Sequence, residues 1–253
     1  GVPLPGRRVT VNLSPAAVPK RGAIFDLAIA LAILAADSKV PAASVSKWIH
    51  LGELGLDGSV RPVPGVLPAL LAAKREGFLK FIVPLENLAE AKMVQGVEVL
   101  GARNLRQVIA FHLGKLPVGA LESEPLTNGA LDARVQSDSD ISDIVGQEEA
   151  VEALTIAAAG AHHILLIGAP GSGKTMLAER LPSILPPQSQ DEAIETAAIR
   201  SLAKSTGVTG SQALSNLRPF EAPHHSASLV SLIGGGPNYP RPGLVSLANN
   251  GVL

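Results

Sequence analysis

A glycine-rich segment of eight residues limits what this chain can fold into more than any other feature. Residues 168–175 (Gly-Ala-Pro-Gly-Ser-Gly-Lys-Thr) match the P-loop pattern G-x-x-x-x-G-K-T/S at every fixed position. The apolar run 163–167 before it predicts a strand, and residues from about 174 to 183 predict a helix. Strand, loop and helix in this order indicate an α/β core.

The residue types in this segment suit a triphosphate ligand. Its glycines allow a tightly curved backbone that turns successive N–H groups inward, and the following helix adds positive partial charge at its N-terminus. Lys174 is the predicted catalytic residue, with its ammonium between the β- and γ-phosphates, and the Thr175 hydroxyl is the predicted Mg²⁺ ligand. The predicted nucleotide-binding residues of the loop are Gly168, Ala169, Pro170, Gly171, Ser172, Gly173, Lys174 and Thr175.

An apolar pair, Ile144 and Val145, stands just before the helix predicted over 147–159. The pair is expected to form a wall for the adenine base. The alternative is an apolar staple of the kind that any helix start can carry.

Composition indicates a globular chain and excludes several kinds of chemistry. The 253 residues, 46 % apolar and 17 % charged, suggest two domains. The absence of Cys excludes disulfides, Cys-ligated zinc, iron–sulfur clusters and thiol nucleophiles.

The most apolar run, Phe25–Ala36, has 12 residues where a membrane span needs about 20, so the sequence predicts a cytoplasmic protein without a membrane segment. Its start, Gly1–Arg7, has no signal pattern and no initiator Met, so a fragment of a longer protein is expected.

Charge divides the chain into two parts. Residues 1–117 hold 14 Lys and Arg against 8 Asp and Glu, a net charge of +6. Residues 118–253 hold 7 against 14, a net charge of −7. The basic part predicts an anionic partner, and ordinary scatter of charge over solvated faces is the alternative.

The periodic pattern of apolar residues divides the chain at the same place. Residues 1–117 predict an α+β unit and residues 142–253 an α/β unit, joined by a linker over 118–141 that is rich in Ser, Asp, Pro and Gly. The first unit is expected to contain strands at 9–13, 81–83 and 97–100, a hairpin of 48–54 with 59–63, and helices at 25–36, 66–76, 87–94 and 103–113. In the second, Ser189 and Glu192 form a capping box for a helix to about 202, and 229–233 and 243–247 are strand-like.

The second unit resembles the Mg-chelatase-like AAA+ ATPases. The resemblance lies in 142–147 (Ser-Asp-Ile-Val-Gly-Gln), 157–162, the P-loop and Leu185-Pro186-Pro187. Segments 218–226, 232–236 and 241–253 are similar to the YifB/ComM branch in particular. The resemblance implies ATP and Mg²⁺ as cofactors and a homo-oligomeric ring, expected to be a hexamer. It also implies that the chain stops at Leu253, before the acidic Walker B pair, so turnover is expected only in the complete protein.

The first unit resembles the proteolytic domain of Lon, a fold shared with ribosomal proteins. The matching segments are 19–22, 52–58, 70–73 and 83–87. The resemblance places the Ser/Lys dyad of such proteases at Ile24 and Leu67, neither of which can act as nucleophile or base. The expected fold is therefore an N-terminally incomplete Lon-like α+β domain without protease activity, followed by an incomplete α/β P-loop AAA+ domain.

Region 218–247 resembles a β-hairpin insertion that faces the pore of the ring. Tyr239 and Arg241 near its tip are candidate DNA contacts through base stacking and phosphate pairing, with an ordinary surface loop as the alternative. The pairs His162-His163 and His224-His225 are not expected to bind a metal, because adjacent side chains diverge and no third ligand stands at the usual spacing.

The resemblance favours an ATP-driven ring motor that remodels DNA by branch migration or helicase activity. One alternative is a magnesium-chelatase-type subunit that uses ATP to help insert Mg²⁺ into a porphyrin. Another is an ATP-gated scaffold that binds a partner without motor activity.

Overall fold

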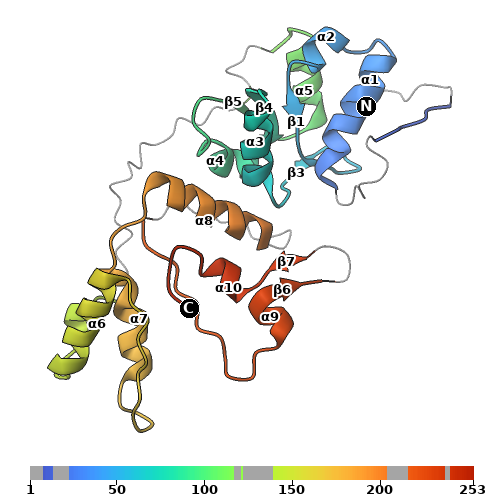
Figure 1. Ribbon diagram of the computed structural model, residues 1–253. Helices are drawn as coiled ribbons and strands as arrows, with labels where there is room; N and C mark the ends of the chain where they lie inside the picture. Colours follow the sequence, from blue (N-terminus) through green and yellow to red (C-terminus); the bar gives the residue numbers. More distant parts are fainter. Residues whose placement is uncertain (1–7, 14–22, 117–120, 122–138, 204–215, 237–239) are drawn as a thin grey trace. The chain divides into compact units, whose positions relative to one another are not determined.

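The computed structural model describes residues 8–13, 23–116, 121, 139–203, 216–236 and 240–253 (Figure 1). The chain divides into two compact units, one with the described residues up to 121 and the other with those from 139. Most of the predicted linker 118–141 lies outside the described residues. Leu121, placed in that linker by the sequence, is fully buried in the core of the first unit.

The first unit is an α+β arrangement around a parallel sheet, as expected. Strand β4 is central in the order β1-β4-β5, and both neighbours run parallel to it. Strands β2 and β3 form an antiparallel hairpin around the turn at Leu56-Asp57-Gly58. The hairpin is shorter than the predicted pairing of 48–54 with 59–63, because residues 49–50 pair in parallel with β4. The elements of this unit are η1 (Ala23–Phe25), α1 (Asp26–Ala36), α2 (Ala42–Val45), β1 (Ile49–His50), β2 (Glu53–Leu54), β3 (Val60–Arg61), α3 (Val66–Arg75), β4 (Lys80–Pro84), η2 (Leu85–Asn87), α4 (Leu88–Ala91), β5 (Glu98–Ala102) and α5 (Leu105–His112).

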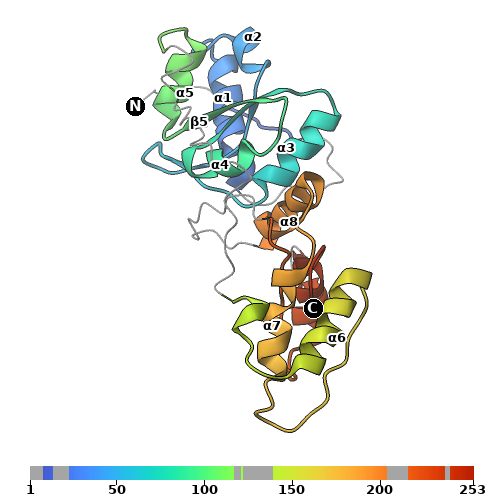
Figure 2. The same ribbon diagram turned by 90° about the vertical axis from the view of Figure 1, so that its left-hand side faces the viewer.

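Helices cover both faces of this sheet, which explains its apolar sequence. Phe81, Ile82 and Val83 of β4 are all fully buried, as expected for a parallel strand between two helical layers. Helices α1 and α5 lie on one face, and α3 and α4 on the other (Figures 1 and 2). A Cβ at Gly101 of β5 would come within 3.0 Å of Leu88, so a glycine at this position lets α4 pack directly on the strand.

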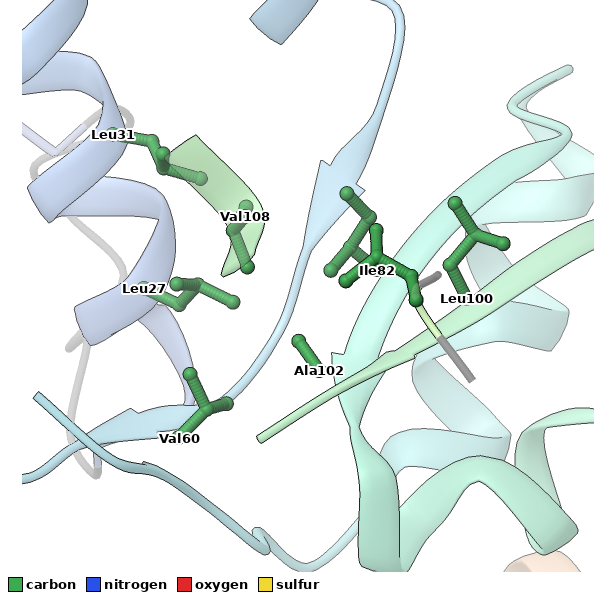
Figure 3. Packing of buried hydrophobic residues seen from close by; sticks show 8 residues of the cluster. Leu27, Leu31, Val60, Ile82, Leu100, Ala102 and Val108 are labelled. Carbon is green, nitrogen blue, oxygen red and sulfur yellow. The ribbon is translucent and has the colours of Figure 1, made fainter. Parts of the chain in front are cut away.

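The core on the α1 side joins residues from five elements. Leu27 and Leu31 point from α1 toward Val108 of α5 and toward the sheet (Figure 3). Helix α1 is apolar around most of its circumference, so the sequence alone does not show which side packs inward. The other buried members of the cluster are Val60, Ile82, Leu100, Ala102 and Leu121.

A buried polar network lies beside this cluster. The Nε2 atoms of His50 and His112 are 2.9 Å apart, so one ring donates a hydrogen bond to the other. The Nδ1 atom of His112 is 2.9 Å from the Ser44 hydroxyl. Burial, with a smaller contribution from the neighbouring His112, lowers the pKa of His50 to about 3. Burial also lowers the pKa of His112, so both rings are neutral at pH 7.

One predicted strand is missing from this unit. Residues 8–13 form no strand, and Val9 and Val11 are about half exposed. A strand is stabilised by hydrogen bonds to a neighbouring strand, and none of the described strands pairs with this segment. The prediction of a strand at 9–13 is therefore wrong for this structure.

The second unit is mainly helical. Helix α8 has the predicted capping box, since the Ser189 N–H donates to Glu192 (2.8 Å) and the Glu192 N–H donates to Ser189 Oγ (3.3 Å). Helices α6 and α7 lie side by side (Figures 1 and 2). The elements are η4 (Ile141–Asp143), α6 (Glu148–Gly160), α7 (Lys174–Ile184), α8 (Gln190–Ala203), α9 (Leu229–Ile233), β6 (Gly234–Gly235), β7 (Arg241–Pro242) and α10 (Leu244–Leu247).

The two strand-like stretches near the C-terminal end are short helices. Residues 229–233 form α9 because Ser228 caps it, accepting a hydrogen bond from the Ser231 N–H (3.1 Å). Residues 243–247 contain α10. Among the residues of this unit that the structure describes, antiparallel pairing is confined to β6 and β7, two residues each. Within the described part of the chain, no helix is both long and apolar enough to span a bilayer.

We expect the first unit to lose stability in acid because of the buried His pair. The unfolded chain binds protons near pH 6.5 and the folded chain does not, so stability falls as pH decreases from about 6.5 toward 3. A His50→Leu variant should show a flatter pH dependence of the free energy of unfolding, by about 3 kcal/mol between pH 7 and pH 4. Urea unfolding followed by fluorescence of Trp48, the one Trp of the sequence, measures this directly.

Ser44→Ala is the matched control, because it leaves both rings in place and should keep the wild-type slope. If the free energy of unfolding of wild type and His50→Leu changed equally with pH, the buried His pair would not be the cause of the loss of stability in acid.

Candidate functional site

The glycine-rich segment lies in the connection from α6 to α7. Gly173 is the N-cap of α7 with φ +81°, and Gly171 has φ +79°. Both lie in the left-handed region that favours glycine, which confirms the reason for expecting glycine at these positions. Gly168 is needed for space, because a Cβ there would lie 2.8 Å from the Ser172 hydroxyl.

Lys174, the first residue of α7, folds its side chain back over this loop. Its Nζ donates to the carbonyl oxygens of Gly168 (2.8 Å) and Ala169 (2.7 Å), and it lies 3.2 Å from Ser172 Oγ. The loop therefore curves around a single ammonium group. Phosphate oxygens are stronger acceptors for an ammonium than neutral carbonyls, so this arrangement fits an anionic ligand.

Thr175 is the second residue of α7 and is exposed at the same helix end. Its hydroxyl, the Lys174 ammonium and the N–H groups of the first turn of α7 form a donor set that fits a Mg²⁺-bound polyphosphate. No acidic residue lies in that first turn, so no carboxylate opposes an anion there. Within the described residues, no group of three or more His, Asp and Glu side chains could hold a metal ion independently.

The predicted strand before the loop is not formed. Residues 163–167 make no ladder, and Leu165 and Ile167 are 81 % and 86 % exposed. A parallel strand needs hydrogen-bonded neighbours on its edges, and no described strand pairs with this segment. The parallel pairing described in this unit is a single bridge from Phe220 to Val252. The prediction of a strand at 163–167 is therefore wrong for this structure, although the helix after the loop is confirmed.

Residues 140–147 bind to α7 near its C-terminal end. The Ile141 N–H donates to Ser183 Oγ (3.2 Å), and Arg180 forms a 3.5 Å ion pair with Asp143. The two residues predicted to cover the adenine base, Ile144 and Val145, belong to this segment. Ile144 is partly buried and Val145 is 95 % exposed, so Val145 presents an uncovered apolar side chain between η4 and α6.

Gln147 is a loop contact that the sequence interpretation missed. Its side-chain amide donates to the Ser172 carbonyl oxygen (3.1 Å), and a Cβ at Gly173 would lie 3.0 Å from its Nε2. Gln147 adopts left-handed angles (φ 58°, ψ 39°) at the start of α6. Its place directly after Gly146, where the chain must turn into a helix, was the available signal.

Of the remaining candidates, those that the structure describes make no hydrogen bond or ion pair with the loop. Arg241 is exposed in β7, and Tyr239 lies outside the described residues. His224 and His225 are exposed with ring centroids 4.1 Å apart, and His224 Nδ1 is bonded to the Ser226 hydroxyl (2.6 Å).

Arg218 has a structural position. It donates to the backbone oxygens of Pro186 (2.7 Å) and Asn250 (2.8 Å) and pairs with Glu192 of α8 at 3.4 Å. These bonds attach the segment before the Phe220–Val252 bridge to the start of α8.

Comparison with known proteins gives family matches for both units. A family model described as "Magnesium chelatase, subunit ChlI" matches residues 140–253, and one described as "Subunit ChlI of Mg-chelatase" matches residues 1–87. The chain is 45 % identical over 251 residues to the competence protein ComM of Haemophilus influenzae, covering 98 % of this chain. It is 44 % identical over 253 residues to the uncharacterized protein YifB of Escherichia coli, covering all of this chain.

The chain spans about half the length of the curated relatives it matches, 48 % of both ComM and YifB. Part of the chain is also similar to Lon protease 2 of Bacillus subtilis, with 33 % identity over 97 residues, 38 % of this chain and 17 % of that protein. In this structure the expected dyad positions hold a partly buried Ile24 and a fully buried Leu67.

We expect the two left-handed loop glycines to differ in their tolerance of a side chain. Gly171→Ala should lower the free energy of unfolding by about 1 kcal/mol through backbone strain alone, because nothing lies within 4 Å of the place its Cβ would occupy. Gly173→Ala should cost more, because its Cβ must also displace Gln147. Urea titration of both variants measures the difference, and a Gln147→Ala background should reduce it. If Gly173→Ala lowered the free energy of unfolding equally in the wild-type and Gln147→Ala backgrounds, this explanation would be contradicted.

Proposed function

Because this chain belongs to the magnesium chelatase-like family, in the branch that contains YifB and ComM, we propose that residues 168–175 bind ATP with Mg²⁺. The observation that carries the proposal is the Lys174 ammonium at the centre of the loop, directly at the N-terminus of an 11-residue helix. A triphosphate placed there exchanges neutral carbonyl partners of Lys174 for charged oxygens.

Each residue of the loop has a role in this proposal. Lys174 neutralises the β- and γ-phosphates, and the first N–H groups of α7 donate to phosphate oxygens. Thr175 holds Mg²⁺ through its hydroxyl, and a bound Mg²⁺ supplies additional charge neutralisation at the phosphates. The apolar side chains of Ile144 and Val145 cover one face of the adenine, which would bury the 95 % exposed Val145.

We propose that the complete protein hydrolyses ATP as a ring, expected to be a hexamer, and uses it to remodel DNA. Supporting features are the net charge of +6 in residues 1–117 and the exposed guanidinium of Arg241. The relative ComM is named a competence protein, which favours a role connected with DNA over a role in pigment synthesis.

A magnesium-chelatase-type subunit is the second candidate function. The description of the family model that matches 140–253 favours it. Similarity of part of the chain to a Lon protease, together with 44–45 % identity to YifB and ComM over nearly the whole chain, favours the DNA-directed branch. Metal insertion into a porphyrin with chelatase partner subunits would support the second candidate, as would absence of DNA affinity at low salt.

We propose no peptidase activity for the Lon-like unit. Ile24 and Leu67 carry no group that can attack a carbonyl or accept a proton. An ATP-gated scaffold remains the third candidate, distinguished by partner binding without ATP turnover.

Lys174→Ala should weaken ATP binding of the full-length protein at least about tenfold and abolish any DNA-stimulated ATPase activity, because the triphosphate loses its principal cation. Titration with a fluorescent ATP analogue and a phosphate-release assay measure the two effects. Lys174→Arg keeps the charge and serves as control for fold and charge, with an intermediate affinity expected. Unchanged binding and rate in Lys174→Ala would mean that nucleotide binds elsewhere.

Arg241→Ala should weaken binding of branched or single-stranded DNA and reduce the salt slope of log K by about 1. Arg75→Ala, on the exposed end of α3, tests whether the basic first unit supplies the contact instead. Filter binding between 50 and 200 mM salt, about the range where phosphate contacts dominate, gives both slopes. Wild-type affinity and slope in Arg241→Ala would exclude this residue as a DNA contact.

A further inference from the structure

Residues 140–147 are attached at two places, to the C-terminal part of α7 and to the loop that precedes this helix. Near the C-terminal end of α7, Ile141 and Asp143 bind Ser183 and Arg180. At the N-terminal end, Gln147 binds the carbonyl oxygen of Ser172 in the loop. The uncovered apolar side chain of Val145 lies in the sequence between these two attachments. The apolar pair is therefore held between two attachments, one to α7 and one to the loop before it, which limit its distance from the loop.

We propose that Gln147 is a positioning residue for the nucleotide, which fixes the curvature of the phosphate loop and its spacing from the base-binding pair. This inference rests on the proposed ATP site. It goes beyond that site because it assigns a role to a side chain that contacts the loop and not the ligand.

The contacts of Ser172 explain how this works. Inside the loop, the Ser172 N–H donates to Ala169 O (3.2 Å) and its hydroxyl lies 3.2 Å from the Lys174 ammonium. Its carbonyl oxygen accepts from the Gln147 amide. Ser172 is therefore bonded both to Lys174, which a triphosphate would engage, and to Gln147, which we assign to holding the loop. The bond to Gln147 holds the backbone curved while Lys174 changes partners.

The backbone of Gln147 also anchors the loop to the start of α6. Its carbonyl oxygen accepts from the N–H groups of Ala150 and Val151, so Gln147 also begins α6. A Cβ at Gly173, the N-cap of α7, would lie 3.0 Å from this Nε2, so a larger residue there would have to displace the Gln147 amide. One residue thus joins the start of α6 to the start of α7.

The test compares four substitutions of Gln147 in the full-length protein. Ala, Asn and Gly all remove the bond to Ser172, since Asn retains an amide but is shorter by one methylene. Asn and Gly also tolerate the left-handed backbone better than Gln. We expect all three to raise the Kd for a fluorescent ATP analogue by about two- to tenfold, the range of one net hydrogen bond, chiefly through faster dissociation. Gln147→Glu should lose more, because a carboxylate cannot donate to the Ser172 carbonyl oxygen and is repelled by it.

Thermal unfolding separates this role from a structural one. Because the Gln147 side chain is exposed, the Ala variant should keep the wild-type melting temperature without nucleotide, and the Asn and Gly variants should match or slightly exceed it because they suit the left-handed backbone. All three should lose part of the stabilisation that ATP gives. Wild-type dissociation rates in the Ala, Asn and Gly variants would overturn the inference. Loss in Ala alone, with Asn and Gly unaffected, would also overturn it and assign the effect to backbone strain.

Lys174→Ala, measured in parallel, distinguishes failure of the site from failure of the inference. If wild type and Lys174→Ala bind the analogue equally weakly, the proposed ATP site is wrong and the inference falls with it. If Lys174→Ala loses binding while every Gln147 variant matches wild type, the ATP site stands and only the inference is overturned.

Discussion

A parallel strand is stable only when its edges are hydrogen-bonded and its faces are covered, and this constraint distinguishes the two units. In the first unit the constraint is met. Strand β4 has a parallel neighbour on each edge and helices on both faces, and its three central side chains are fully buried. In the second unit the equally apolar segment 163–167 has no described neighbour and exposes Leu165 and Ile167. Similar apolar segments have different outcomes because partner strands, not propensity, decide whether a parallel strand forms.

The glycine-rich loop, residues 168–175, keeps its curvature without that strand. Its curvature comes from the left-handed glycines 171 and 173, from the bonds of Lys174 to Gly168 and Ala169, and from Gln147 outside it. All of these interactions lie within 30 residues of chain and depend on helices α6 and α7, which pack against each other. Local hydrogen bonds can therefore assemble the candidate site even where the sheet around it is absent from the described residues.

Much of the fold was predictable where local chemistry decides it. The capping box of Ser189 and Glu192, the hairpin turn at Leu56-Asp57-Gly58 and the helix starting at Lys174 were all recognisable from residue types at fixed spacing. The strands expected at 9–13 and 163–167 failed because pairing is a property of two segments. The prediction of a strand at 229–233 was wrong for another reason, because the Ser228 cap stabilises this apolar run as a short helix.

The sequence by itself determined the P-loop, the left-handed positions that need glycine and the apolar character of the Lon-like dyad positions, because each follows from residue type. Only the tertiary structure decided that Gln147 touches the loop, that Leu121 belongs to the first core, and that His50 meets His112 across 62 residues of sequence. Contacts between distant segments depend on how helices pack in space, and no local pattern of residues encodes that distance.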